Sequence, residues 1–431
     1  METSHFIILL ILLGCMASYI PVFMCLFFTA VLGFLFFTDL PLLLLAQTVF
    51  RSMDNFALVV VLFFILCGNI MTAGSIVNRL ITVANALVSW LPGGLGMAGV
   101  LACGLFGAIS GSTVATVVAL GGFMIPALLD NGYPERYTIG LMTTSPNLGV
   151  IIPPSIGMIL YSMISNVSLE GLFLTGFLPG VLIMLGACLY SYFVFRKRVE
   201  IVRKPVPKPM ELLAVLKEGF WSLMLPVIIF GGIFSGAFTA NEAAVVACVY
   251  AFIVELFIHR SLKLTAVKKL TVNSAVTSAT LLIIVAGATC FGRLLTLENI
   301  PGKITETVLS AIQSPYTFLF AMNILLLFVG MFMDIISATM ILGPVFLPML
   351  DAFGISWMHF GLIMTVNLAI GYCTPPMGVS LYITGAIANR DLIYVTKAVI
   401  PFLIIQFAVL LIITYMPDAV LWLPRMMGFI Q

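Results

Sequence analysis

Two Pro-Pro pairs stand at matching places in two similar stretches of the sequence. Pro153-Pro154 recurs as Pro375-Pro376, 222 residues later, and each pair ends a Gly-x-x-x-Pro-Pro segment (GVIIPP and GYCTPP). At this spacing the segments Gly121–Pro179 and Gly343–Pro401 align without a gap. Paired Gly/Pro-interrupted segments in two halves of an apolar chain are the best sequence indication of a secondary transporter's binding site. The repeat therefore predicts a transporter.

The composition is that of a polytopic membrane protein. Of the 431 residues 62% are hydrophobic and 8% are charged, with a mean hydropathy of +1.20, whereas soluble domains are about 25% charged. Apolar runs near 20 residues predict an all-α fold, because a membrane-spanning helix needs about that length. A formal net charge of +2 gives no reason to expect a nucleic-acid partner. The eight cysteines lie in apolar runs without CxxC spacing and are interpreted as small hydrophobic residues.

The apolar runs predict about 10–12 spans, and residues 6–37, with Pro21 inside, are one kinked helix or two short ones. Residues 94–128 and 317–350 have a polar or small cluster at their middle, which predicts two re-entrant hairpins. The Pro-Pro segments predict two broken helices, at about 137–165 and 358–388. Such irregular backbone is tolerated at membrane depth only where it lines a cavity or is buried in protein.

The basic residues indicate how the two halves are oriented. Seven of the 19 lie between Arg196 and Lys217, whereas the equivalent tail 417–431 has only Arg425. Conversely, Phe37–Thr48 has Asp39 and no basic residue, and its counterpart His259–Leu270 has four. Because Lys and Arg favour the cytoplasmic side, equivalent loops lie on opposite sides.

This bias predicts an inverted repeat. Residues 1–195 form the first repeat, 196–218 a basic cytoplasmic linker and 219–431 the second repeat. We expect both termini to be periplasmic in a bacterial inner membrane. The first hairpin then enters from the cytoplasm and the second from the outside.

The hairpin tips and broken helices are predicted to meet and to bind ions and substrate. Proline removes a backbone donor and frees carbonyl groups, which suit a dehydrated cation, whereas half-helix N-termini suit an anion. The expected cation ligands are Ser110, Ser112, Thr113, Asn147, Gly149, Asp334, Ser337, Asn367, Gly371 and Thr374. The expected substrate-binding residues are Ser112, Thr113, Pro153, Pro154, Ser155, Ser337, Thr339, Pro375 and Pro376.

Simpler interpretations exist for these residues. Membrane Ser and Thr often bond to their own helix backbone or hold helices together, and a Pro-Pro pair can be only a kink. Asp334 is unusual, since a carboxylate inside an apolar run costs about 2.5–3.5 kcal/mol. We expect Asp334 to bind or couple a cation. The alternatives are a structural role, as an ion pair or helix cap, and proton transfer. Arg293, near the end of a span, is expected to be interfacial.

The membrane potential determines how many cations, at least, must be transported with an anionic substrate. Each charge that crosses the membrane is worth about 2.3 kcal/mol per 100 mV, so an anion entering a negative interior is opposed. Two cations neutralise a dianion and drive a monoanion, which makes two repeat-related cation sites a sensible minimum for a carboxylate importer. The sequence has no Walker A motif, so ATP is not the direct energy source.

Over essentially its whole length the chain resembles the large membrane (M), or DctM-like, subunit of tripartite ATP-independent periplasmic (TRAP) transporters. The segments that carry the resemblance are GAISGSTVATVVALGGFMIPALL, NLGVIIPPSIGMILYSMI, GMFMDIISATMILGPVFLPML and FGLIMTVNLAIGYCTPPMGVSLYITGAIA. The resemblance implies an elevator-type, non-enzymatic symporter with Na⁺ as coupling ion and no other cofactor. It also implies a separate small membrane (Q) subunit of four helices, and a periplasmic substrate-binding (P) protein that delivers an organic carboxylate.

By position, the resemblance makes Ser110–Thr113 and Asp334–Thr339 the hairpin tips. Asn147–Pro154 and Asn367–Pro376 become the unwound helices. C4-dicarboxylates and sugar acids both fit such a site, and the sequence does not choose between them.

Three other classes of protein compete with this interpretation. A carrier of related architecture that works without a binding protein is the closest alternative. A channel would not need two occluding hairpins. An intramembrane protease is disfavoured because Ser110 lacks the first Gly of a Gly-x-Ser-Gly motif and has no membrane-embedded histidine as base.

Overall fold

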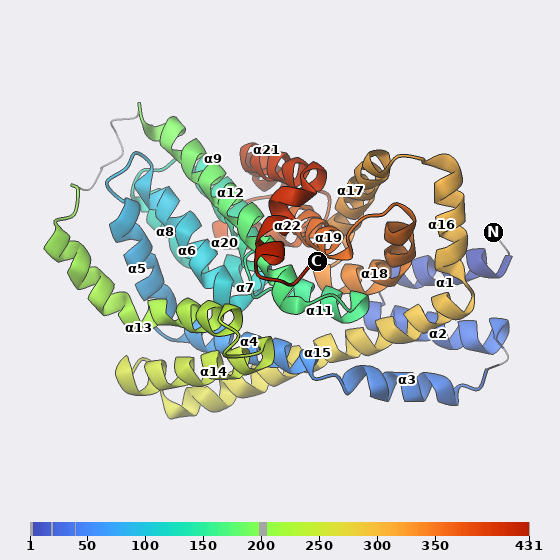
Figure 1. The fold of residues 1–431 in the computed structure, drawn as a ribbon. Helices are drawn as coiled ribbons and strands as arrows, with labels where there is room; N and C mark the ends of the chain where they lie inside the picture. The colour runs from blue at the N-terminus through green and yellow to red at the C-terminus, as the bar shows by residue number, and fades with distance from the viewer. Residues whose placement is uncertain (1–2, 19, 39, 198–204, 431) are drawn as a thin grey trace.

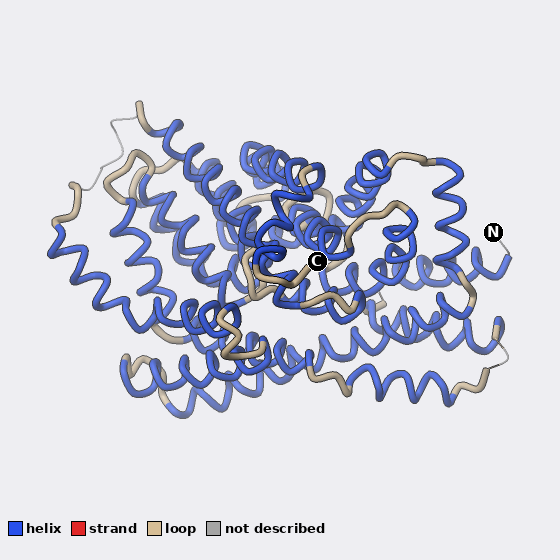
Figure 2. The backbone as a smooth tube through the Cα atoms, in the orientation of Figure 1, coloured by secondary structure: helices blue, strands red, loops and turns tan. Residues whose placement is uncertain are grey.

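The computed structural model describes residues 3–18, 20–38, 40–197 and 205–430, and every regular element in these ranges is a helix (Figures 1 and 2). Within them, nine helical segments are long and apolar enough to cross a membrane, or up to ten if a bent pair counts as one span. The predicted all-α polytopic fold is confirmed. Asp39 and the basic residues at 198–204, which entered the orientation argument, lie outside the described residues.

The first half divides its apolar runs into short and long helices. Residues 6–37 form two short helices, and the second begins directly after Pro21, as expected where proline ends a helical run. The helices are α1 (Thr3–Ala17), α2 (Val22–Phe37), α3 (Leu43–Met53), α4 (Ala57–Ala73), α5 (Ile76–Val88), α6 (Gly94–Ser110), α7 (Thr113–Thr116), η1 (Val117–Gly121), α8 (Gly122–Asp130), α9 (Glu135–Thr144), η2 (Ser145–Asn147), α10 (Leu148–Ile151), α11 (Ile156–Ser165) and α12 (Leu169–Phe195).

The second half contains the longest helix of the described chain, of 34 residues, which spans about 50 Å at 1.5 Å per residue. Its helices are α13 (Pro209–Phe234), α14 (Ala240–Ile253), η3 (Val254–Ile258), α15 (Leu264–Leu297), α16 (Ile300–Ala311), α17 (Pro315–Phe332), α18 (Ile335–Ala352), α19 (Trp357–Gly371), α20 (Val379–Ala388), α21 (Leu392–Tyr415) and α22 (Pro417–Met426).

The two halves use corresponding helices. Adding 222 to the bounds of α6 gives 316–332, against Pro315–Phe332 for α17. The same shift carries residues 113–130, which α7, η1 and α8 cover, onto the bounds of α18. The helical breaks of the two repeats therefore lie at equivalent places. Their opposite orientation across a membrane stays a prediction.

Three segments differ from the sequence-based expectation. The loop expected at Phe37–Thr48 contains the start of α3, the tail 417–431 contains α22, and the linker expected over 196–218 is helical from Pro209. The helices α3 and α22 have 11 and 10 residues, too short to be recognised as spans. Proline at the first position of α13 is a common helix start, because its missing N–H is not needed there.

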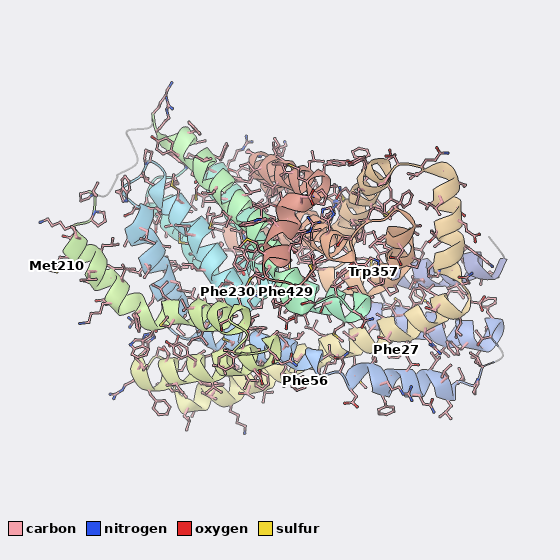
Figure 3. The ribbon with its side chains drawn as sticks, in the orientation of Figure 1. Phe27, Phe56, Met210, Phe230, Trp357 and Phe429 are labelled. Carbon is pink, nitrogen blue, oxygen red and sulfur yellow. The ribbon has the colours of Figure 1, made fainter. Side chains whose placement is uncertain are left out.

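An outer group of helices lies along one side of the molecule. The long helix α15 packs against α2, α3 and α4, while α14 packs against α4 (Figure 1). Apolar side chains are exposed here, such as Phe50 on α3 and Phe56 directly before α4 (Phe56 is labelled in Figure 3), as expected for a surface that faces lipid. The hairpins and broken helices form the other group, and α18 is the hairpin arm that contacts α15.

Candidate functional site

Each hairpin turns at a residue that caps the helix after it. In the first, Gly111 has φ = 62° and Ser112 accepts a hydrogen bond from the Ala115 N–H (3.4 Å). In the second, the Asp334 carboxylate accepts a hydrogen bond from the Ser337 N–H (2.9 Å). Ser112 and Asp334 are 222 residues apart, so they occupy the same repeat position, and both are the residue types that cap helices well.

Asp334 is thus a helix cap in the structure. Its side chain is half-buried and forms no ion pair with any described residue. The cap does not use all the acceptor capacity of a carboxylate, which has two oxygens. Its role as a cation ligand stays a prediction.

The broken helices are interrupted where the Pro-Pro pairs predict. The first break follows α10, and α11 begins after Ser155, whose side chain accepts a hydrogen bond from the Met158 N–H (3.3 Å). The second break separates α19 from α20. Both Pro153-Pro154 and Pro375-Pro376 have a cis peptide bond. The first break is buried, whereas Pro376 in the second is exposed.

Hairpin tips and breaks contact one another. The Ile156 N–H, at the start of α11, donates to the Gly111 carbonyl in the first tip (3.4 Å). The Ile335 N–H, in the second tip, donates to the Tyr372 hydroxyl in the second break (3.0 Å). The second break also reaches the first half, because the Cys373 thiol donates to the Thr143 carbonyl (3.3 Å). The four elements therefore form one connected centre.

Two predicted ligands, Gly149 and Gly371, are places where backbones pack closely. A Cβ on Gly149 would lie 2.6 Å from the Thr116 hydroxyl oxygen. A Cβ on Gly371 would lie 2.6 Å from the Gly330 carbonyl carbon in the first arm of the second hairpin. Glycine permits this approach because it has no side chain, and overpacking such a contact costs about 1–3 kcal/mol.

Five polar oxygens near the tips and breaks are buried without a hydrogen-bond partner among the described residues: Thr113 Oγ1, Ser145 Oγ, Ser337 Oγ, Asn367 Oδ1 and Ser380 Oγ. Leaving a buried polar group unpaired costs about 1–3 kcal/mol, so such groups are uncommon. Ser145 and Asn367 are 222 residues apart and occupy equivalent positions. The first repeat thus contributes two free oxygens and the second three, and three of the five residues were predicted as ligands.

Two other predicted ligands, Ser110 and Thr374, have partners in their own helix or in a neighbouring one. The Ser110 hydroxyl bonds to that of Thr116 (3.3 Å), and the Thr374 hydroxyl donates to the Ile370 carbonyl (2.8 Å). Thr339 is buried on α18. These contacts match the simpler interpretation, in which membrane Ser and Thr bond to nearby backbone or hold helices together.

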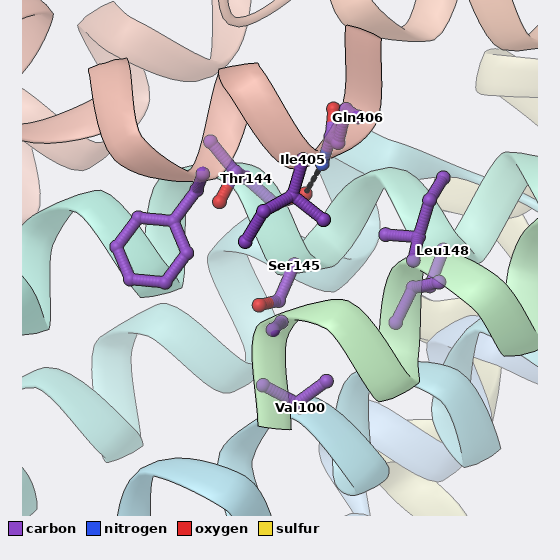
Figure 4. A pocket seen from close by; sticks show the side chains of 9 residues that line it. Val100, Thr144, Ser145, Leu148, Ile405 and Gln406 are labelled. Atoms are coloured by element: carbon purple, nitrogen blue, oxygen red, sulfur yellow. Dashed lines mark hydrogen bonds between the residues drawn. The ribbon is translucent and has the colours of Figure 1, made fainter. Parts of the chain in front are cut away.

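Two amides that the sequence interpretation missed hold the broken helices in place. The Asn147 amide donates to the Gln406 side-chain oxygen (2.9 Å). The Gln406 amide in turn donates to the Thr144 carbonyl (2.9 Å; Figure 4). The Asn367 amide donates to the Asn323 side chain (2.7 Å). Gln406 and Asn323 are single amides inside apolar runs. Because a polar side chain in a membrane segment is costly, this placement could have indicated a specific role for both residues.

A small cavity lies behind the first break, between α9, α6 and α21. It has a volume of about 10 Å³, and Ser145, Leu148 and Val100 are among its lining residues (Figure 4). This is about the space of one water molecule. A single small ion or water fits beside Ser145, but an organic substrate does not.

Comparison with known families now identifies the class of protein. The family model "Tripartite ATP-independent periplasmic transporter, DctM component" matches residues 9–419. The chain belongs to this family. Members are large permeases of bacterial TRAP transporters, which are not enzymes and work with a small membrane subunit and a periplasmic binding protein.

Individual relatives of this TRAP permease support the assignment. It is 40% identical over 384 residues to the C4-dicarboxylate TRAP transporter large permease protein DctM of Pseudomonas aeruginosa, covering 89% of this chain and 90% of that one. It is 35% identical to the sialic acid TRAP transporter large permease protein SiaM of Vibrio cholerae, covering 96% and 97%. The fold resembles the Alcanivorax borkumensis YdaH transporter, with a TM-score of 0.62 at 15% identity, covering 88% and 89%.

Proposed function

We propose that this permease imports an organic carboxylate by sodium symport, and that the free oxygens at the tips and breaks bind the coupling Na⁺ ions. The observation that carries the proposal is the set of five buried, unpartnered oxygens, two in the first repeat and three in the second. Na⁺ is a hard cation that takes neutral hydroxyl and carbonyl oxygens as ligands. Filling these positions would remove the cost of leaving the oxygens unpaired.

We propose that the substrate carboxylate binds at the starts of α11 and α18. The N-terminus of a helix attracts anions, since its first N–H groups are unpaired and its dipole is positive there. Ser155 and Ser112 add hydroxyl groups at such starts, and Ser337 and Thr339 lie in the first turns of α18. Pro153, Pro154, Pro375 and Pro376 shape the backbone around the same centre.

The relatives named for C4-dicarboxylates and sialic acid motivate the carboxylate class. We further propose an inner-membrane location with both termini periplasmic, a separate four-helix small subunit, and an elevator motion of the hairpins and broken helices against the outer helices. A carrier that works without a binding protein is the alternative.

The test is uptake of radiolabelled succinate and of sialic acid into proteoliposomes. These hold the permease, its small subunit and its binding protein, with and without an inward Na⁺ gradient. We expect uptake of one of the two anions that requires both Na⁺ and the binding protein. Uptake that persists without Na⁺ would refute the coupling, and uptake that persists without the binding protein would favour the alternative carrier.

A further inference from the structure

A large cavity lies between the outer helices and the second hairpin, away from the candidate site. Its volume is about 680 Å³, within the range of small-molecule sites. On one side it is lined by α3 and α15, and on the other by α18 and α11. Figure 1 shows where these helices lie in the fold. The small cavity behind the first break, by contrast, has room for about one water molecule.

The two walls differ in chemistry. The outer-helix wall is polar: α3 contributes Gln47, Thr48 and Arg51, and α15 contributes Thr289, Arg293 and Thr296. On each helix the lining positions recur every three or four residues, so the cavity is lined by one continuous helix face. The opposite wall on α18 is apolar, with Met340, Leu347 and two prolines. A polar ligand in this cavity is therefore held by α3 and α15.

The polar wall is cationic. Arg51 and Arg293 are the only charged residues among the described lining residues, both are exposed, and neither forms an ion pair with a described carboxylate. The hydroxyls of Thr48 and Thr289 donate to carbonyls of their own helices (2.7 and 2.8 Å), so they add acceptors and no free donor. Two guanidinium groups lining one open cleft favour an anion, and guanidinium matches a carboxylate with two parallel hydrogen bonds.

Two of the helices that line the cavity, α11 and α18, also belong to the candidate site. Met340 directly follows Thr339 on α18, and Met163 lies toward the end of α11, which begins at the first break. The helices whose starts are proposed to hold the carboxylate thus line the cavity opposite the wall that carries the two arginines. In the expected orientation, α3 follows an outside loop, which places the cavity on the side from which substrate arrives.

We infer that Arg51 and Arg293 form an anion-collecting site that binds the substrate carboxylate before it reaches the hairpin tips. This inference rests on the proposed import of a carboxylate. A cationic cleft with low-dielectric walls raises the local concentration of an anion and its rate of association. The two arginines increase the rate of substrate capture, whereas the ion-coupled step takes place at the hairpin tips and helix breaks.

The test compares initial uptake rates of wild type, Arg51→Gln, Arg293→Gln and the double variant. The probe is whichever of succinate and sialic acid the wild type takes up. We expect the apparent KM of the double variant to rise about tenfold, with the maximal rate within about twofold. Raising ionic strength should raise the KM of the wild type and have little effect on the double variant, because salt screens exposed charges. Arg51→Lys and Arg293→Lys should retain the salt dependence.

Controls separate this inference from its alternatives. Arg425→Gln removes one positive charge at an exposed residue paired with Asp418 and should not change the KM. An unchanged KM in a double variant that elutes and melts like the wild type overturns the inference alone. Absence of any carboxylate uptake by the wild type overturns the proposed function, and the inference with it.

Two further outcomes also overturn the inference. If the double variant binds the binding protein more weakly in a pull-down, the arginines contact that protein. If its defect occurs in vesicles containing phosphatidylglycerol and is absent in pure phosphatidylcholine, the arginines hold a lipid headgroup. The expected result is equal docking of the binding protein and the same KM change in both lipids.

Discussion

At the residue scale, the question is whether the free oxygens of Thr113, Ser145, Ser337 and Asn367 bind Na⁺. An unpaired buried polar group destabilises the fold, so an oxygen that binds nothing is only a cost. If such a group has no ligand, removing it leaves stability unchanged or raises it. If it binds Na⁺, removing it lowers ion affinity without lowering the stability of the ion-free protein. The two interpretations therefore predict different results for one substitution.

Ser337→Ala tests this difference. We expect the melting temperature without Na⁺ to stay equal or to rise, by the equivalent of about 1 kcal/mol at most, since an orphan hydroxyl is removed. We expect the Na⁺ concentration for half-maximal uptake to rise about tenfold, which corresponds to about 1.4 kcal/mol of lost binding. Uptake rate and melting temperature are both measured across a Na⁺ titration.

The matched control is Ser162→Ala, on α11. Its hydroxyl is also buried but donates to the Ile159 carbonyl (2.8 Å). It should leave the Na⁺ dependence unchanged. Equal Na⁺ dependence in Ser337→Ala and Ser162→Ala would contradict a cation site at Ser337.

The sequence located the polar centre but could not distinguish a ligand from a cap. Ser112, Ser155 and Asp334 follow a helix break, where Ser and Asp serve equally as ion ligands and as N-caps. Their cap bonds depend on the backbone that the break adopts. Ser145 was not predicted as a ligand, because only the packing around it shows that its hydroxyl has no partner.

At the element scale, Glu255 in η3 fixes the start of α5. Its buried carboxylate accepts hydrogen bonds from the Ser75 N–H (2.8 Å) and the Ile76 N–H (2.7 Å), and the Ser261 hydroxyl also donates to it. The first N–H groups of a helix have no partner inside the helix, so the carboxylate caps α5 from a distant segment. It thereby joins the α4–α5 turn to the end of α14.

Glu255→Ala should destabilise the protein strongly. It leaves the buried Ile76 N–H and the part-buried Ser75 N–H unpaired, at about 1–3 kcal/mol for each buried donor, so we expect a loss of about 2–4 kcal/mol. Glu255→Gln keeps one side-chain acceptor and should lose less. The melting temperatures of the purified variants provide the measurement, and an equal loss in both would show that negative charge, rather than acceptor capacity, is what α5 requires.

His259 makes the same joint sensitive to pH. Burial, and then the charge of Arg79, lower the pKa of the His259 imidazole, while Glu255 opposes them. An unfolded histidine titrates near pH 6.5. Below that pH the unfolded chain binds a proton that the folded protein resists, so stability falls as pH falls from about 6.5 toward the folded pKa.

We therefore expect His259→Gln to reduce the drop in melting temperature between pH 7 and pH 5. Gln keeps a polar side chain near Ser75, whose hydroxyl lies 3.0 Å from the His259 Nδ1, but it does not titrate. An identical drop in wild type and variant would mean that other groups set the acid sensitivity.

At the scale of the whole molecule, the repeat and the apolar runs were enough to predict the fold class, and the charge bias predicted an orientation. Four helices could not be found from apolar length: α3, α5, α16 and α22 have 10–13 residues each. The cavity between α3, α15 and α18 depends on how distant elements pack. The sequence therefore predicted only an interfacial position for Arg293 and could not show that it lines the large cavity.

The same cavity gives a test of the proposed elevator motion, because Ser52 on α3 and Leu347 on α18 line opposite walls. If the hairpins slide against the outer helices during transport, linking the two walls should arrest uptake. We expect Ser52→Cys with Leu347→Cys, treated with a bis-maleimide, to lose most of its uptake, whereas each single variant keeps it. Most native cysteines are buried, which limits their reaction with the reagent.

The matched control links two residues on the same wall. Thr48 on α3 and Thr289 on α15 line the cavity together, and these helices pack against each other. Thr48→Cys with Thr289→Cys should cross-link and still transport, because no moving boundary is bridged. If both pairs cross-link fully and both still transport, the second hairpin does not move against α3, and a rocking or local gating motion must carry the substrate across. If only the pair that spans the cavity stops transport, the boundary between the moving and fixed parts runs between α3 and α18.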